Sequence, residues 1–294
     1  MSLLRARVAA GEASRLGPGQ MVAIEGDEAF RLVRVSRARP GEAIELFDGE
    51  GRAWRARVAS ISRGRLVCRV EGIGASAEPA LRVILIQAIL KAGRMELALE
   101  KATELGAAEI WLARTHRSVV RPEPGPVRVE RWRRVVENAA RQCGRARFPE
   151  LRGPMEWEQA IASLAHQAPR WPRLLAYEGA RHSPQAATED VEGPSPEGVG
   201  LAVGPEGGLE AEEVEMAIRA GFQVVGLGPR VLRAETASVV LLALTQARWG
   251  DLRGFPGPAG RGPGEQATGP GAAFPKRREA GQAGGSPGSA GRPS

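Results

Sequence analysis

Apolar residues alternate with polar ones along much of residues 1–75. Five short runs have the period of two that is typical of half-buried strands, and turns containing Gly or Pro separate them. The runs are residues 20–26, 29–35, 42–48, 53–61 and 65–72. This series predicts a small antiparallel β-barrel over residues 1–73, and the small residues that follow up to residue 80 predict a linker.

The pattern changes from residue 81 onward. Residues 81–90 form a continuous apolar run, typical of a strand buried on both faces, and residues 95–106 have helical spacing that ends at Gly106. Strand-like runs at 109–113, 174–179, 200–204 and 224–228 then alternate with helical runs at 129–143, 212–221 and 236–250. The alternation predicts a parallel sheet with helices on both faces over residues 80–252. The remainder of 149–200, rich in proline and charge, resists assignment.

Composition fits a globular protein of one large or two ordinary domains. The chain has 294 residues, of which 43% are hydrophobic and 26% charged. No apolar run is long enough for a membrane helix, and no secretory signal is expected, so a cytoplasmic location is predicted. Two cysteines and three histidines predict neither a disulfide framework nor a metal site. Residues 254–294 contain 12 Gly and 7 Pro and predict a disordered tail.

The chain is basic, and nearly all of its basic residues are arginine. The formal net charge is +7, and all but Lys91, Lys101 and Lys276 of the 41 basic residues are Arg, as in proteins from GC-rich genomes. Residues 116–147 contain nine arginines against three glutamates. This excess suits a phosphate backbone. The alternative is a solvated helix face with pairs such as Glu130–Arg134.

Two glycine-containing loops follow strand-like runs. GPEGG at 204–208 comes directly after an apolar strand, and ligands of open α/β sheets bind at the carboxyl ends of strands. The loop has neither the dinucleotide-binding nor the P-loop spacing, and its Glu206 would repel phosphate. It therefore suits an uncharged adenosine or a cationic group, although an ordinary strand-to-helix turn is the alternative.

The second loop, LGPRVLRAETA at 227–237, brings three ionisable groups together. Arg230, Arg233 and Glu235 lie between a buried strand and an apolar helix, where charged groups are costly unless they are paired. One interpretation is a ligand-binding loop. The other is an Arg233–Glu235 pair that holds the turn.

Both loops together, in this order, resemble the RsmE family of the SPOUT superfamily of RNA methyltransferases. The segments KAGRMELALEKATELGAAEIW at 91–111, AFRLVRVSRARPGEAIELFDGEG at 29–51 and ERWRRVVENAARQCGRARFPEL at 130–151 share in the resemblance, which covers about residues 5–252. The chain departs from the family pattern at Phe30, where histidine is common, at Ser36, where leucine is usual, and at Glu210, where a Ser or Thr cap is usual.

The resemblance implies an α/β fold in which a C-terminal, trefoil-knotted SPOUT methyltransferase domain follows a small PUA-like β-barrel that binds RNA. It implies methylation of uridine N3 in 16S (small-subunit) ribosomal RNA, with S-adenosylmethionine (SAM) as methyl donor and no metal. The expected partners are small-subunit rRNA or the 30S subunit, together with a second copy of the chain in a homodimer. The alternatives are a noncatalytic RNA-binding or ribosome-assembly protein and a SPOUT methyltransferase that acts on another RNA.

The resemblance also implies site residues. The residues expected to bind SAM are Gly204, Pro205, Glu206, Gly207, Gly208, Leu227, Gly228, Arg230, Leu232 and Thr236. The candidates for catalysis, without assigned roles, are Arg230, Arg233 and Glu235. The residues expected to contact RNA are Arg31, Arg34, Arg37, Arg141, Gln142 and Arg145. For Arg145 the alternative is an ion pair with a carboxylate such as Glu150 that holds the end of its helix.

Overall fold

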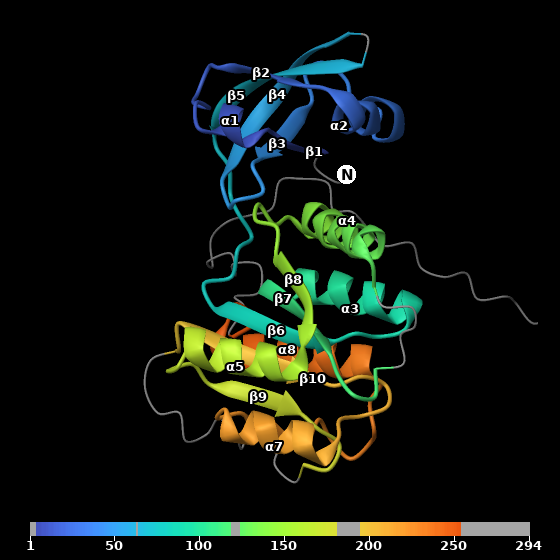
Figure 1. The fold of residues 1–294 in the computed structure, drawn as a ribbon. Coiled ribbons are helices and arrows are strands. Elements are labelled where there is room, and N and C mark those ends of the chain that lie inside the picture. Colours follow the sequence, from blue (N-terminus) through green and yellow to red (C-terminus); the bar gives the residue numbers. More distant parts are fainter. Residues whose placement is uncertain (1–3, 63, 119–123, 181–194, 254–294) are drawn as a thin grey trace, which may run out of the picture. The chain divides into compact units, whose positions relative to one another are not determined.

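The computed structural model describes residues 4–62, 64–118, 124–180 and 195–253, and its elements form two separate sheets (Figure 1). The N-terminal sheet has the strand order β1-β3-β4-β5-β2. Its strands are β1 (Leu4–Arg7), β2 (Met21–Ile24), β3 (Ala43–Phe47), β4 (Ala53–Ser62) and β5 (Arg65–Ile73). The short helices are α1 (Ala10–Ala13), α2 (Gly26–Phe30) and the π-helical turn η1 (Arg31–Val35).

The N-terminal sheet differs from the predicted antiparallel barrel in two ways. β1 pairs with β3 in parallel, and the order of the described strands ends at β1 and β2 without closing. The run at 29–35, predicted as a strand, is helical, because its fully buried residues, Ala29 and Leu32, are three positions apart rather than two. The strand that takes its place in the sheet is β1, which lies before the first of the predicted runs.

The second sheet consists of six parallel strands in the order β11-β9-β10-β6-β7-β8, as the alternating pattern predicts. The strands are β6 (Arg82–Ala88), β7 (Ala107–Arg114), β8 (Glu150–Glu156), β9 (Arg173–Ala176), β10 (Gly198–Val203) and β11 (Gln223–Val225). The helices are α3 (Ala92–Glu104), α4 (Pro126–Cys143), α5 (Trp157–Gln167), α7 (Ala211–Arg219) and α8 (Ala234–Trp249).

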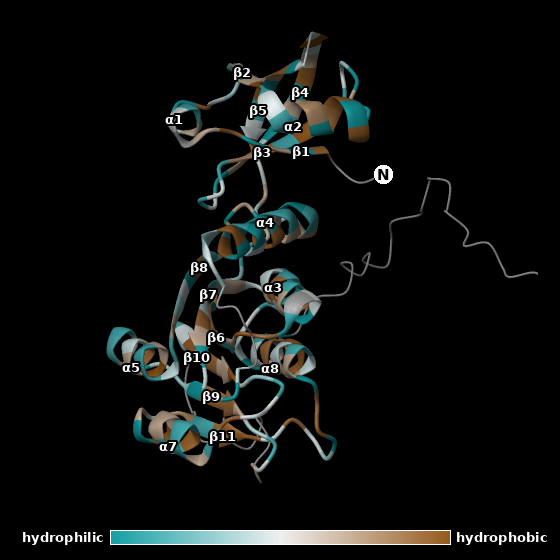
Figure 2. Cartoon of the chain, turned by 45° about the vertical axis from the view of Figure 1, so that its right-hand side comes forward, coloured by the Kyte–Doolittle hydropathy of each residue, from teal (hydrophilic) through white to brown (hydrophobic). Residues whose placement is uncertain are grey.

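Helices cover both faces of this sheet. Side chains of β6 alternate between two cores: Val83 and Leu85 pack with α3, α4 and α8, while Ile84 and Ile86 pack with α5 and α7. Helices α3, α4, α5 and α7 are amphipathic, with brown and teal residues on different sides (Figure 2), whereas apolar residues are spread around α8. The continuous apolar run at 81–90 is therefore explained by burial on both faces, as predicted.

Some predicted features lie outside what the structure describes or tests. The tail at 254–294 falls outside the described residues, and the domain limits 1–73 and 80–252 remain predictions. Among the described residues, no helix has the length and apolar character needed to cross a bilayer.

Candidate functional site

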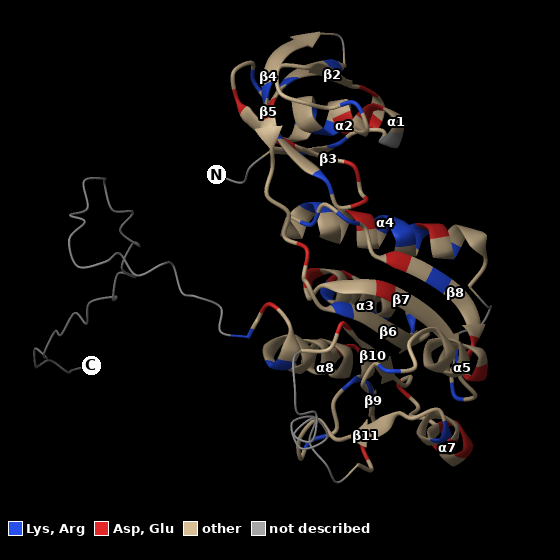
Figure 3. Cartoon of the chain, turned by 90° about the vertical axis from the view of Figure 1, so that its left-hand side faces the viewer, with Lys and Arg blue, Asp and Glu red and all other residues tan. Residues whose placement is uncertain are grey.

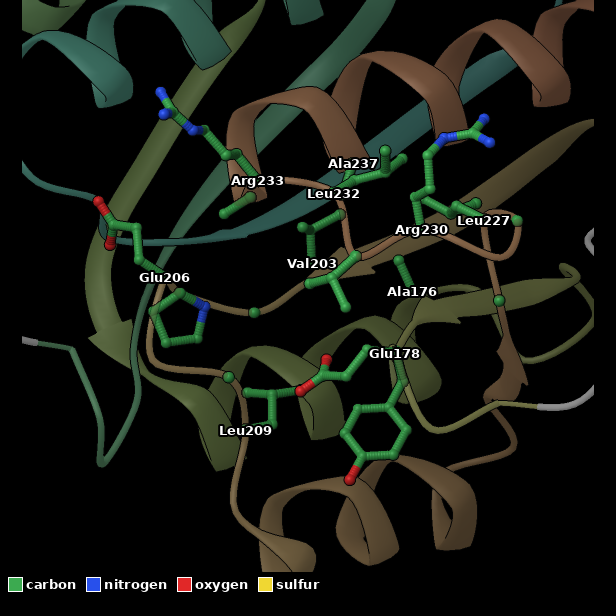
Figure 4. A pocket seen from close by; sticks show the side chains of 18 of the residues that line it. Ala176, Glu178, Val203, Glu206, Leu209, Leu227, Arg230, Leu232, Arg233 and Ala237 are labelled. Carbon is green, nitrogen blue, oxygen red and sulfur yellow. The ribbon is translucent and has the colours of Figure 1, made fainter.

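The main pocket lies where the carboxyl ends of three neighbouring strands meet. β11, β9 and β10 are adjacent and parallel, so the loops that follow them leave the same edge of the sheet. These loops enclose a pocket of about 330 Å³ (Figure 4). The lining residues are Arg94, Ala176, Tyr177, Glu178, Val203, Gly204, Pro205, Glu206, Gly208, Leu209, Gly226, Leu227, Gly228, Pro229, Arg230, Val231, Leu232, Arg233, Ala234 and Ala237.

The first glycine loop needs glycine at positions where a side chain would collide. A Cβ atom at Gly204 would lie 2.8 Å from Leu209 Cγ, and one at Gly208, where φ is +73°, would lie 3.1 Å from Glu178 Oε1. Gly207 is different, since it does not line the pocket. Its added Cβ would instead meet Arg117 Cβ at 3.2 Å, on another side of the loop. The structure therefore does not support the predicted role of Gly207 in cofactor binding.

The second glycine loop passes close to the end of β9. A Cβ at Gly226 would lie 2.9 Å from the carbonyl oxygen of Ala180, whereas one at Gly228, where φ is +107°, would have no atom within 4 Å. Leu227, Gly228, Arg230 and Leu232 line the pocket, as expected for residues that bind a ligand there. Thr236 is exposed and is not part of the lining, so its predicted contact with the cofactor is not supported.

Arg230 and Arg233 are both exposed and direct their guanidinium groups away from Glu178 and Leu209 (Figure 4). Neither side chain has a hydrogen-bond or ion-pair partner within the described parts of the chain. The predicted alternative, an Arg233–Glu235 pair, does not form there. The free donors of both arginines are available to a second ligand at the rim of the pocket.

Glu235 instead belongs to a network that joins both glycine loops to α3. Arg94 lies 3.4 Å from Glu206 Oε1 through Nη1 and 4.0 Å from Glu235 Oε1 through Nε. The backbone N–H of Lys91 also donates to Glu206 Oε1, at 3.0 Å. Glu235 is 6% exposed, and its Oε2 atom has no hydrogen-bond partner in the described structure. Arg94 was not among the predicted site residues, although it lies in the KAGRME segment of the resemblance.

A histidine also lies near the first loop in space, although none is close in sequence. The exposed His116 places Nδ1 2.9 Å from Oε1 of Glu210, the residue before α7. Glu210 departs from the usual Ser or Thr, yet its backbone N–H donates to Glu213 Oε2 at 2.9 Å in a capping box. The start of α7 is thus capped despite the substitution.

The predicted RNA contact of Arg145 is contradicted by its burial. Its side chain is 3% exposed, and Nη2 lies 2.9 Å from Glu78 Oε2 in the linker before β6. Nη1 donates to the carbonyl oxygens of Thr103 and Ala107 at 3.1 and 2.7 Å. The ion-pair alternative is therefore the correct one. Its partner is Glu78 rather than Glu150, which pairs with Arg152.

The other predicted RNA-binding residues are all more exposed than Arg145, but they differ in how many partners they have within the protein. Arg141 lies 3.4 Å from Glu137 and 5.4 Å from the Phe148 ring centroid, while Gln142 is exposed. Acidic and basic residues are mixed along α4, as Figure 3 shows. Arg31 donates to Glu28 Oε1 at 2.9 Å and to the carbonyl oxygen of Arg5 at 2.8 Å.

Arg34 and Arg37 differ from these residues. Both are exposed, and their side chains have no hydrogen-bond or ion-pair partner in the described ranges.

Comparison with known proteins identifies the family to which the chain is similar. An RNA methyltransferase domain model matches residues 77–246, and an RNA methyltransferase PUA domain model matches residues 24–71. The ribosomal RNA small subunit methyltransferase E of Mycobacterium bovis is 35% identical over 241 residues, which cover 79% of this chain and 89% of that protein.

The chain belongs to the ribosomal RNA small subunit methyltransferase E family. A solved relative from Neisseria gonorrhoeae, bound to S-adenosyl methionine, has a TM-score of 0.75 and 31% identity, with 85% of this chain and 99% of that chain covered. A methyltransferase from Legionella pneumophila with bound SAM has a TM-score of 0.73 and 29% identity, covering 85% of this chain and 100% of that chain. In this methyltransferase E family member, both glycine loops, Glu78 and Arg145 lie inside the methyltransferase domain match, and Phe30 lies inside the PUA domain match.

Proposed function

We propose that this protein transfers a methyl group from SAM to N3 of a specific uridine in 16S ribosomal RNA. The observation that carries the proposal is the pocket itself, because glycine loops from neighbouring strand ends allow a ligand to approach main-chain groups closely. Relatives named ribosomal RNA small subunit methyltransferase E, and one of them solved with bound S-adenosyl methionine, support the assignment of substrate and cofactor.

The chemistry of the lining residues fits SAM. SAM supplies an electrophilic methyl group on a positively charged sulfonium. Leu209, Leu227 and Leu232 provide apolar surface for the adenine, and the main chain of both loops provides donors and acceptors for its edges and for the ribose. Glu206 is held by Arg94 and the Lys91 N–H. Glu178 has no side-chain partner among the described residues, so we assign its free carboxylate to the cationic part of the cofactor.

We assign the target uracil to the rim formed by Arg230 and Arg233. In neutral uridine N3 carries a proton, which must pass to water before N3 can bond to the methyl carbon; the bond between that carbon and sulfur then breaks, and S-adenosylhomocysteine leaves. Guanidinium donors to the uracil carbonyl oxygens stabilise the anion that forms. Glu235 is buried beside Arg94 and is not among the residues that line the pocket, so we propose that it positions Arg94 rather than contacting uracil.

We further propose the family's knotted C-terminal topology and a homodimer. The close approach of Gly226 to Ala180 supports a chain path in which the segment before α8 runs against the loop after β9. Ribosomal RNA as substrate supports a cytoplasmic location. Light scattering on the purified protein tests the dimer, and a monomeric mass with full methyl transfer would contradict it.

The decisive experiment compares small-subunit rRNA from a strain without the gene, the same strain complemented with wild-type protein, and the parent strain. Mass mapping of rRNA fragments is expected to show the loss of one methyl group on a single uridine and its return on complementation. An unchanged map would contradict the proposal. Calorimetric titration with S-adenosylhomocysteine separates the noncatalytic alternative, which predicts no heat up to millimolar ligand.

A further inference from the structure

Phe30, the last residue of α2, is mostly exposed. The residue is 61% exposed, and Phe30 is the only aromatic residue among the large exposed hydrophobic residues of the described ranges. Single exposed apolar residues are common, so exposure alone does not identify a site. The surroundings of Phe30 are therefore what matters.

The local backbone fixes the ring in its outward position. Helical backbone runs from Gly26 through η1 to Val35, and Ala29 and Leu32 are fully buried against the sheet. Phe30 and Val35 therefore face solvent, with Val35 71% exposed. A π-helical turn such as η1 is rare and is often found at functional sites.

The neighbouring cations give this surface a chemical character. Arg34 lies one helical turn after Phe30, and Arg37 follows shortly after η1 with a positive φ of 55°. Both guanidinium groups lack partners in the part of the chain that the structure describes, whereas Arg31 is tied to Glu28. An exposed aromatic residue with unpaired arginines in the same short segment is one combination by which proteins bind unpaired RNA bases: the ring stacks on the base, and the arginines contact phosphates.

We propose that Phe30 stacks on an unpaired base of the substrate RNA while Arg34 and Arg37 contact the adjacent phosphates. The ligand class rests on the proposed function, but the stacking residue goes beyond it. The helical structure of 29–35 is essential here, because the strand predicted from the sequence would place residues 30 and 34 on one face together with the buried Leu32.

Salt dependence separates stacking from charge contacts. The affinity of the full-length protein is measured for small-subunit rRNA and for a mixed-sequence single-stranded RNA, over a series of salt concentrations. Phe30→Ala is expected to weaken binding at least five-fold and to leave the slope of log K against log salt unchanged. Arg34→Ala is expected to make that slope shallower by about 0.7.

Substitutions of different shape test the stacking itself. Phe30→Trp is expected to keep wild-type affinity and to show extra fluorescence quenching on RNA binding, whereas Phe30→Leu is expected to behave like Phe30→Ala. Val127→Ala is the matched control, since Val127 is 86% exposed on α4, and it is expected to leave affinity unchanged. All variants are expected to keep the wild-type melting temperature and SAM affinity.

Two results would overturn the stacking role: unchanged affinity in Phe30→Ala, or full affinity in Phe30→Leu, which would indicate a general apolar contact such as a protein-binding face. If the wild type binds SAM and methylates rRNA while Phe30→Ala binds RNA normally, only this inference fails. If the wild type does not methylate rRNA, the proposed function itself fails.

Discussion

Arginines at the end of α4 and in the second glycine loop stand in similar sequence surroundings but in opposite environments. Arg145 is 3% exposed, and its donors are bound by Glu78 and two carbonyl oxygens. Arg230 and Arg233 are exposed at the rim of the pocket. In the sequence both regions have closely spaced arginines, so charge density alone predicts binding for both. What separates a structural arginine from a binding one is whether a carboxylate from a distant segment reaches it.

Breaking the buried network is expected to have the largest effect. Arg145→Ala leaves Glu78 and two carbonyl oxygens without their donor, so the free energy of unfolding is expected to fall by about 3 kcal/mol. Chemical denaturation measures this loss. Arg134→Ala, at a side chain that is 75% exposed on α4, is the control and should change stability by less than about 0.5 kcal/mol. An unchanged unfolding midpoint together with a shallower RNA salt slope would restore the RNA-binding role of Arg145.

The second test uses the second glycine loop, where a matched pair of variants separates the effect of backbone strain on stability from an effect on SAM binding. Gly228 and Gly41 both have positive φ, and a Cβ at either would meet no atom within 4 Å. Alanine at either position is expected to cost about 1–2 kcal/mol of stability. Only Gly228→Ala, at a residue that lines the pocket, is expected to weaken SAM binding, by about 100-fold in calorimetry. Equal SAM affinity in the two variants would remove this loop from the cofactor site.

The third test concerns Glu178, whose carboxylate lines the pocket without a side-chain partner among the described residues. Glu178→Gln is expected to weaken SAM binding about ten-fold, since it removes a negative charge from the cationic ligand. Binding of S-adenosylhomocysteine, which lacks the sulfonium charge, should change by less than two-fold, by the same electrostatic argument. Equal losses for both ligands would instead assign Glu178 to the ribose or the amino acid part of the ligand.

The smallest effect concerns Asp48, whose carboxylate binds an arginine as Glu78 does. Burial raises the pKa of Asp48. Hydrogen bonds from the Arg52 side chain and from the backbone N–H groups of Glu50 and Arg52 together lower the pKa by more than burial raises it, so the net shift is downward. Because the pKa of Asp48 is lower in the folded than in the unfolded protein, its carboxylate stabilises the fold at pH values above the unfolded-state pKa. This stabilisation is lost as the pH falls below about 4. Asp48→Asn is therefore expected to reduce the acid sensitivity of the melting temperature, and an identical pH profile would contradict this.

Sequence reasoning worked where the signal is local. The apolar run at 81–90 became β6, Gly106 ends α3 with φ of +82°, and the two glycine loops lie together in one pocket. It failed where burial does not follow the apparent period, as at 29–35. It also failed at β8, an edge strand whose side chains are mostly accessible and so leave no apolar pattern.

Within the site, the residues that were missed come from other segments of the chain. Arg94 reaches the pocket from α3, and Glu178 reaches it from the end of β9. The pairing of Arg145 with Glu78 spans 67 positions, so no local pattern could distinguish Glu78 from the nearer Glu150.

The position of the pocket at three strand ends has a consequence for folding kinetics. Its walls follow β9, β10 and β11, and β11 pairs with β9 rather than with β10, the strand that precedes it in the chain. The pocket can bind a ligand only when all three strands are paired in register. Pairings between strands that are distant in sequence form slowly, because loop closure must precede them. Cofactor binding during refolding is therefore expected to be a late event, and a fluorescent cofactor analogue would report completion of the native sheet rather than early collapse.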